Sequence, residues 1–254
     1  MSGPDSGQPR ASAGGDLPQR ASGAAPWRMA GAGLVAALVA WTVVAKWYPF
    51  FKSGLSFAPG AAPSAEESAL LFRQQWQNYA VLFALAGSLI GAGLGLTARR
   101  RAAIGCFSGA VFGAVFGALA SWCVLRLADQ PFDAIVDPKE NYAEIVKWTI
   151  IHAIAWTVTG FGVGLGCSLP WASWTEIGRK TAGAMLGGLI AGPCFHVLIS
   201  LIELIKPMGG TEMLVPDRPF NQLIWMATAG VLIGLLAGSL GVKAAKKPKP
   251  APAA

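Results

Sequence analysis

The chain has 254 residues, of which 54% are hydrophobic and only 13% are charged, and its mean hydropathy is +0.49. Such a composition excludes an ordinary soluble domain and predicts an integral membrane protein. The formal net charge is +7, but the basic residues are spread along the chain and do not form one patch. We therefore expect the lipid bilayer, and no nucleic acid, as a partner of the chain.

The two ends of the chain differ from its middle. Residues 1–25 are rich in Gly, Pro, Ser and Ala without hydrophobic periodicity, and residues 246–254 read KKPKPAPAA. Both ends are expected to be disordered tails, the second one basic and proline-rich. A polar tail precedes the first apolar run, and that run is longer than the apolar part of a usual secretory signal. We therefore expect the run to be retained as an anchor.

Residues 26–245 contain six apolar stretches, each long enough to cross the roughly 30 Å hydrocarbon core of a bilayer as a helix. Their approximate bounds are 29–48, 79–98, 102–125, 147–168, 181–205 and 222–242. The predicted fold class is all-α: a polytopic membrane protein in which residues 26–245 form a six-helix transmembrane bundle, with the second to sixth helices tightly packed through small residues. Before the second span, Ser64 and Glu67 form a capping-box pattern. Residues 64–77 are either a short interfacial helix or an outward extension of that span.

The positions of Lys and Arg predict the orientation. If every span crosses once, the basic clusters before the first span, between the second and third, before the fifth and after the sixth share one side. Basic loops remain in the cytoplasm. We therefore expect both termini to be cytoplasmic, in a bacterial-type inner (plasma) membrane. Aromatic residues are expected at the two membrane interfaces, with Trp148 and Trp225 among those at the outer one.

The third span carries four glycines at strict four-residue spacing, and no charge occurs from Ala102 to Leu125. In water such glycine density would weaken a helix, but in lipid it leaves a flat strip that another helix backbone can approach closely. We interpret this run as a glycine zipper, formed by Gly105, Gly109, Gly113 and Gly117. The pattern resembles the glycine-rich spans of the mitochondrial Tim translocase family, over the second and third spans only. Since that family has four spans, the resemblance implies no residue role in this chain.

Glycine patterns also recur between spans. The sequence Gly91-Ala-Gly93-Leu-Gly95 in the second span matches Gly162-Val-Gly164-Leu-Gly166 in the fourth, and the sixth span has a similar pattern. The second, fourth and sixth spans are therefore interpreted as equivalent, as are the third and fifth, which predicts parallel repeats about an axis along the membrane normal. Chance similarity between glycine-rich helices is the alternative. Besides the zipper, helix packing is expected at Gly91, Gly95, Gly183, Gly187, Gly230, Gly234 and Gly238.

Polar side chains within the spans are few, and each is a functional candidate because polar groups are costly inside a bilayer. His196, Ser200 and Glu203 share one face of the fifth span, and His152 lies in the same half of the fourth. These four residues are a candidate polar cavity, open to the outside, that could carry protons or bind a cation. The alternative is that each histidine bonds a neighbouring carbonyl or hydroxyl and that Glu203 reaches headgroup water or pairs with Lys206. Their spacing is not that of a metal site, and we expect no metal and no cofactor.

Gly192 and Pro193 fall near the middle of the fifth span, where the proline removes a backbone donor and crowds the preceding turn. We expect a kink at this position. The kink either exposes carbonyl groups at a midplane site, as in transporters, or only shapes the bundle.

No catalytic residue is expected. The sequence Cys106-Phe-Ser108-Gly109 resembles the serine motif of rhomboid intramembrane proteases, but that family has Gly where this chain has Cys106, and neither histidine lies in the last span. No P-loop, Rossmann or HExxH pattern occurs in a fitting context. The sequence therefore favours a non-enzymatic membrane scaffold or partner-binding subunit, which binds a membrane-protein partner or a second copy of itself as a homo-oligomer. The alternative is a small channel or transporter for an ion or small solute.

Overall fold

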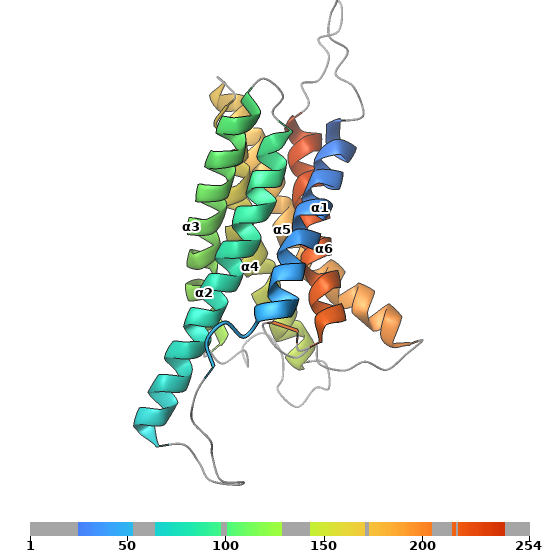
Figure 1. Cartoon of the computed structure of the whole chain (residues 1–254). Helices are drawn as coiled ribbons and strands as arrows, with labels where there is room; N and C mark the ends of the chain where they lie inside the picture. Colours follow the sequence, from blue (N-terminus) through green and yellow to red (C-terminus); the bar gives the residue numbers. More distant parts are fainter. Residues whose placement is uncertain are drawn as a thin grey trace, which may run out of the picture.

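The computed structural model describes residues 25–52, 64–97, 101–128, 143–170, 173–204, 215–216 and 218–241. Within these ranges the chain forms six α-helices, each long and apolar enough to cross a membrane (Figure 1). The prediction of an all-α chain with six membrane-crossing helices is therefore confirmed. The predicted tails lie outside the described residues, apart from Ala25. The helices are α1 (Ala25–Trp47), α2 (Ala65–Leu96), α3 (Ala102–Ala128), α4 (Ala143–Ser168), α5 (Trp174–Glu203) and α6 (Pro219–Gly241).

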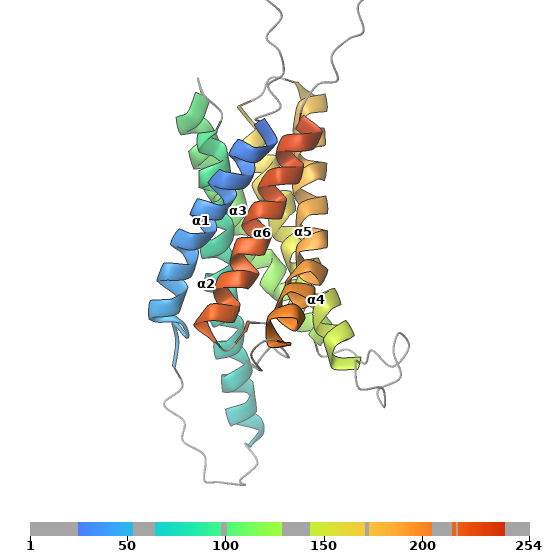
Figure 2. The ribbon, with the colours of Figure 1, turned by 90° about the vertical axis from the view of Figure 1, so that its right-hand side faces the viewer.

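The second helix is longer than its predicted span, because α2 continues without a break from Ala65 to Leu96. It begins with a complete capping box: the Glu67 N–H donates to Ser64 Oγ at 3.2 Å, and the Ser64 N–H donates to Glu67 Oε2 at 2.7 Å. Residues 64–77 are therefore an outward extension of the span and not a separate interfacial helix. Figures 1 and 2 show this extension projecting beyond the other helices. We call this end of the bundle the stalk end, and the opposite end, where α1 begins and α6 ends, the tail end.

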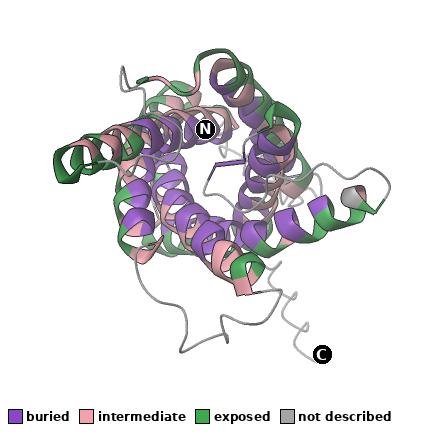
Figure 3. Cartoon of the chain, turned by 90° about the horizontal axis from the view of Figure 1, so that it is seen from below, coloured by how far each residue is buried: buried purple, intermediate pink, exposed green. Residues whose placement is uncertain are grey.

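The six helices form a ring in which sequence neighbours pack together and α1 packs against α6 to close the ring. The even-numbered helices α2, α4 and α6 also contact one another, so they form the inside of the ring, and α1, α3 and α5 fill the gaps between them. Viewed along the bundle, the buried residues face inward (Figure 3). The first helix is thus part of the ring, where it contacts both α6 and α2.

Two polar contacts help to hold α1 in the ring. Trp41 Nε1 donates to the Pro219 carbonyl oxygen at 2.7 Å and joins α1 to the start of α6. Asn78 of α2 accepts from the Phe51 N–H at 2.8 Å and donates to the Phe51 carbonyl at 2.9 Å. The segment that follows α1 is therefore fastened to α2 by a double hydrogen bond at the stalk end.

Helices come into backbone contact at many of the glycines. A methyl group built on Gly91 of α2 would overlap the Gly109 carbonyl oxygen of α3, and one built on Gly113 would overlap the Gly87 carbonyl. Similar contacts occur between α4 and α5 and between α6 and α1. The glycines that face a partner backbone in these three pairs are Gly87, Gly91, Gly95, Gly105, Gly109, Gly113 and Gly117; Gly160, Gly164, Gly188 and Gly192; and Gly33, Gly230, Gly234 and Gly238.

The glycine contacts also define the register between helices. Gly93 of α2 faces α1, the preceding helix, and Gly162 of α4 likewise faces its preceding helix, α3. In contrast, Gly160 and Gly164 face the following helix, α5, as Gly91 and Gly95 face α3. Alternate glycines of α2 and of α4 thus face the preceding and the following helix. The match read in the sequence between Gly91-Ala-Gly93-Leu-Gly95 and Gly162-Val-Gly164-Leu-Gly166 stays a prediction.

Candidate functional site

The candidate site is the contact between His152 of α4 and His196 of α5. His152 Nδ1 and His196 Nε2 are 3.0 Å apart, which is a hydrogen-bond distance. The two helices approach this closely because Gly192 of α5 lies against the α4 backbone at Ala153. His196 follows Gly192 by about one helical turn, so its ring lies on the same side of α5 and reaches His152.

The two imidazole rings are nearly coplanar and meet edge to edge. Their planes differ by 19° and their centroids are 5.1 Å apart. The centroid separation exceeds the 3.0 Å nitrogen separation by about the sum of the two ring radii, so the facing nitrogens lie close to the line between the centroids. The pair is therefore an in-line N–H···N hydrogen bond and not a face-to-face stack.

The donor and the acceptor of this hydrogen bond depend on the tautomers of the two rings. In the neutral pair one of the two facing nitrogens, His152 Nδ1 or His196 Nε2, carries a proton and donates it to the other.

The histidine pair is enclosed by other residues of the bundle. His152 has no exposed surface, and His196 is 7% exposed. The His152 ring lies 5.6 Å from the ring centroid of Phe195 and 5.6 Å from that of Trp225. The surroundings that these contacts define are aromatic, so the hydrogen bond between the two imidazoles lies inside the bundle.

Three aromatic rings, one from each inner helix, meet at the centre of the bundle beside His152. They are Phe83 of α2, Trp156 of α4 and Trp225 of α6, which we call the central triad. The centroid distances are 5.6 Å for Phe83–Trp156, 5.5 Å for Phe83–Trp225 and 4.9 Å for Trp156–Trp225, in tilted, edge-to-face arrangements. All three side chains are fully buried. The central triad therefore packs α2, α4 and α6 together at this level of the bundle.

Sequence reasoning did not identify the central triad. Trp225 was expected at the outer membrane interface, but it is fully buried. The one residue whose position in the sequence could have indicated the triad is Trp156, because it lies in the middle of the fourth predicted span, far from either interface. A tryptophan at that depth favours a position inside the bundle, although its neighbours follow only from the packing.

Of the four residues predicted to line a polar cavity, the two histidines are in contact. The Ser200 side chain is exposed on the surface of α5. Glu203 is the last residue of α5, and its side chain lies outside the described part of the structure. The Ser108 hydroxyl is buried and lies 2.7 Å from the carbonyl oxygens of both Gly166 and Ile104. Ser108 therefore links α3 to α4.

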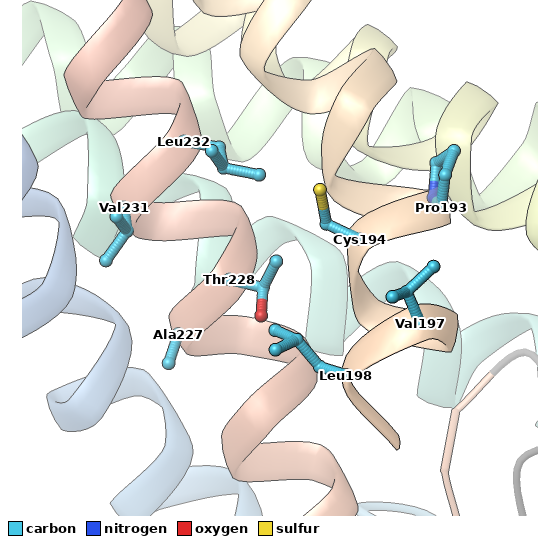
Figure 4. A pocket seen from close by; sticks show the side chains of 8 residues that line it. All are labelled: Pro193, Cys194, Val197, Leu198, Ala227, Thr228, Val231 and Leu232. Atoms are coloured by element: carbon cyan, nitrogen blue, oxygen red, sulfur yellow. The ribbon is translucent and has the colours of Figure 1, made fainter. Parts of the chain in front are cut away.

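At the predicted kink, α5 continues as a helix through Pro193. Pro193 is exposed, whereas Gly192 is buried against α4. Beside Pro193 a groove of about 550 Å³ lies on the surface between α5 and α6, and its other lining residues include Cys194, Leu198 and Thr228 (Figure 4). The lining is almost entirely apolar. Such a groove suits contact with lipid tails and offers little to an ion.

The fold and the site define an integral membrane protein of the polytopic α-helical class. Within the described ranges, no group of three or more His, Cys, Asp or Glu residues is placed to hold a metal ion. No protein-family model matches the chain, and neither a curated protein nor a solved structure matches it.

Proposed function

We propose that this protein is a non-enzymatic membrane scaffold or partner-binding subunit. The observation that supports this role is the packed centre of the bundle, where Phe83, Trp156 and Trp225 meet with no exposed surface. A conducting path or a transported substrate needs a hydrated space between the helices. A scaffold needs a stable shape and an accessible outer surface.

Glycine zippers supply the stable shape in this proposal. In lipid the hydrophobic effect does not hold helices together, and close backbone packing takes its place. The glycine contacts in the α2–α3, α4–α5 and α6–α1 pairs favour this mode of assembly. The outer surface carries large apolar side chains, such as Phe107 at 73% exposure and Val115 at 58%. Lipid, a membrane-protein partner or a second copy of the chain would contact this surface.

A channel or transporter is the second candidate, and the histidine pair is the observation that favours it. Polar side chains deep inside a membrane bundle often belong to ion or proton pathways. His152 and His196 lie beside the central triad, within the spans of α4 and α5. Solute flux in liposomes separates the two candidates: the scaffold leaves the permeability of the bilayer unchanged, and a transporter raises it for at least one solute.

We further propose that both termini face the cytoplasm of a bacterial-type inner membrane. Arg101, Arg179 and Lys180 lie near the tail end of the bundle, while Glu66 and Glu67 lie at the stalk end, which fits the positive-inside rule. A fluorescent protein fused after Ala254 is expected to be bright, and alkaline phosphatase fused at the same position is expected to be inactive. A dark fluorescent fusion with an active phosphatase would reverse the orientation.

A further inference from the structure

We propose that the ring opens sideways, toward the lipid, between α1 and α2. Of the six neighbouring helix pairs around the ring, α1 and α2 share the least contact. The seam between them closes a ring whose other five seams pack more extensively. It is therefore the seam at which separation breaks the fewest contacts. The opening is a property of the single chain, so it does not depend on the proposed scaffold role.

The helix pairs show why this seam differs from the others. The α2–α3, α4–α5 and α6–α1 pairs are each closed by several glycines that face a partner backbone. We infer that these pairs are three equivalent hairpins around one axis, with α1 serving as the second helix of the hairpin that α6 begins. On this arrangement α3–α4, α5–α6 and α1–α2 are the three seams between hairpins.

Two of the three seams between hairpins are closed by glycine. Between α3 and α4, Gly162 and Gly166 face the α3 backbone. Between α5 and α6, Gly183 and Gly187 face the α6 backbone. The α1–α2 seam has one such residue, Gly93: a methyl group built on it would lie 2.8 Å from Ala36 Cβ and 3.2 Å from the Ala32 carbonyl oxygen. The partner backbone is thus 3.2 Å from a methyl group at Gly93, compared with 2.5 Å at both Gly162 and Gly166, so α1 packs less closely on α2.

The remaining contacts of α1 define how it would move. Gly33 lies against the Gly230 backbone, and Trp41 is bonded to Pro219, so α1 stays with α6. The double hydrogen bond between Phe51 and Asn78 joins α1 to α2 at the stalk end. The freest part of the seam is therefore its tail half. Separation there exposes Ala36 and Gly93 to lipid tails, which are as apolar as the helices themselves, so desolvation opposes it little.

Spin labels on exposed residues near the tail end test this opening. Val35 of α1, Leu96 of α2 and Ile104 of α3 are 61%, 58% and 59% exposed, so each accepts a label without disturbing a contact. Cysteine replaces two of them at a time in a variant lacking Cys106, Cys123, Cys167 and Cys194. The Val35–Leu96 pair reports the seam, and the Leu96–Ile104 pair, which shares one site, reports the α2–α3 hairpin as the control.

Electron paramagnetic resonance of the protein in lipid nanodiscs is expected to give two distances for the seam pair and a single narrow one for the control. Ala36→Cys with Gly93→Cys, oxidised before labelling, is expected to leave only the shorter seam distance. The control pair, measured in the same locked protein, verifies that the fold is kept. The proposal would be overturned if the Val35–Leu96 distance distribution, in the protein without the added disulfide, were single and as narrow as that of the control pair. It would also be overturned if two Val35–Leu96 distances persisted after the disulfide had formed.

Discussion

Leucine in place of Gly109 is expected to force α2 and α3 apart and to destabilise the whole bundle. Any side chain at this position overlaps the Gly91 carbonyl, and a shift of either backbone would also disturb the contacts at Gly95 and Gly113 in the same seam. Overpacking costs about 1–3 kcal/mol where side chains can adjust. Because the obstructing atoms here are backbone, we expect at least the upper end of that range. The measurement is the melting temperature and monodispersity of the purified protein in detergent.

Gly31 provides the matched control for this substitution. It lies in a membrane-crossing helix as Gly109 does, but it is exposed, and a methyl group built on it meets no atom within 4 Å. Gly31→Leu is therefore expected to leave the melting temperature nearly unchanged. Equal stability of Gly31→Leu and Gly109→Leu would show that close backbone contact does not hold the bundle together.

Removal of one histidine is expected to destabilise the bundle more than removal of both. His196→Leu removes the hydrogen-bond partner that lies 3.0 Å from His152 Nδ1, where His152 has no exposed surface. An unsatisfied buried polar group costs about 1–3 kcal/mol, whereas apolar replacement of both partners is often nearly neutral. A double-mutant cycle of His152→Leu and His196→Leu, measured by unfolding in detergent, should therefore show a favourable coupling energy between the two residues.

Ser200→Ala is the control for the histidine cycle. Ser200 lies one helical turn after His196 on α5, but its side chain is exposed, so we expect no coupling between Ser200 and His152. Additive effects of the two histidine substitutions would contradict the hydrogen-bonded pair. A coupling of Ser200 to His152 would also contradict it.

The number and class of the helices could be predicted because a membrane crossing depends on the composition of one continuous segment. The start of α2 could not be placed in this way. Its first turns carry Glu66, Glu67 and Arg73, which end the apolar pattern, yet the helix continues because the Ser64 capping box satisfies its first backbone donors. Hydropathy locates the part of a helix that lies in lipid, and capping decides where the helix itself begins.

The pairing of helices was less accessible to sequence reasoning. Gly31 and Gly33 are two residues apart in a glycine-rich helix, but Gly33 lies against the Gly230 backbone and Gly31 faces open space. A small residue permits the close approach of another helix, but it does not determine which helix that is. The closure of the ring by α1 and α6 therefore depended on the three-dimensional arrangement.

The candidate site was predicted in part. Helical spacing placed His196 and Ser200 on one face of α5. That face is broad, and of these two residues only His196 is buried against α4, whereas Ser200 is exposed. The partner of His196 required a contact between two helices, which one sequence does not specify. The aromatic rings that pack against His152 come from α5 and α6, and the two histidines form an enclosed pair where the sequence predicted a polar cavity.

Solute flux through the purified protein in liposomes tests the packed centre of the bundle directly. Vesicles loaded with reporters for H⁺, K⁺, Na⁺, Cl⁻ and glycerol are compared with empty vesicles and with vesicles that contain a known channel. If the central triad and the histidine pair close the bundle, flux through the wild-type protein equals that of empty vesicles for every solute. A flux above that level in the wild type, abolished by His196→Leu in a variant that remains folded, would contradict the scaffold and establish a transport path through the histidines.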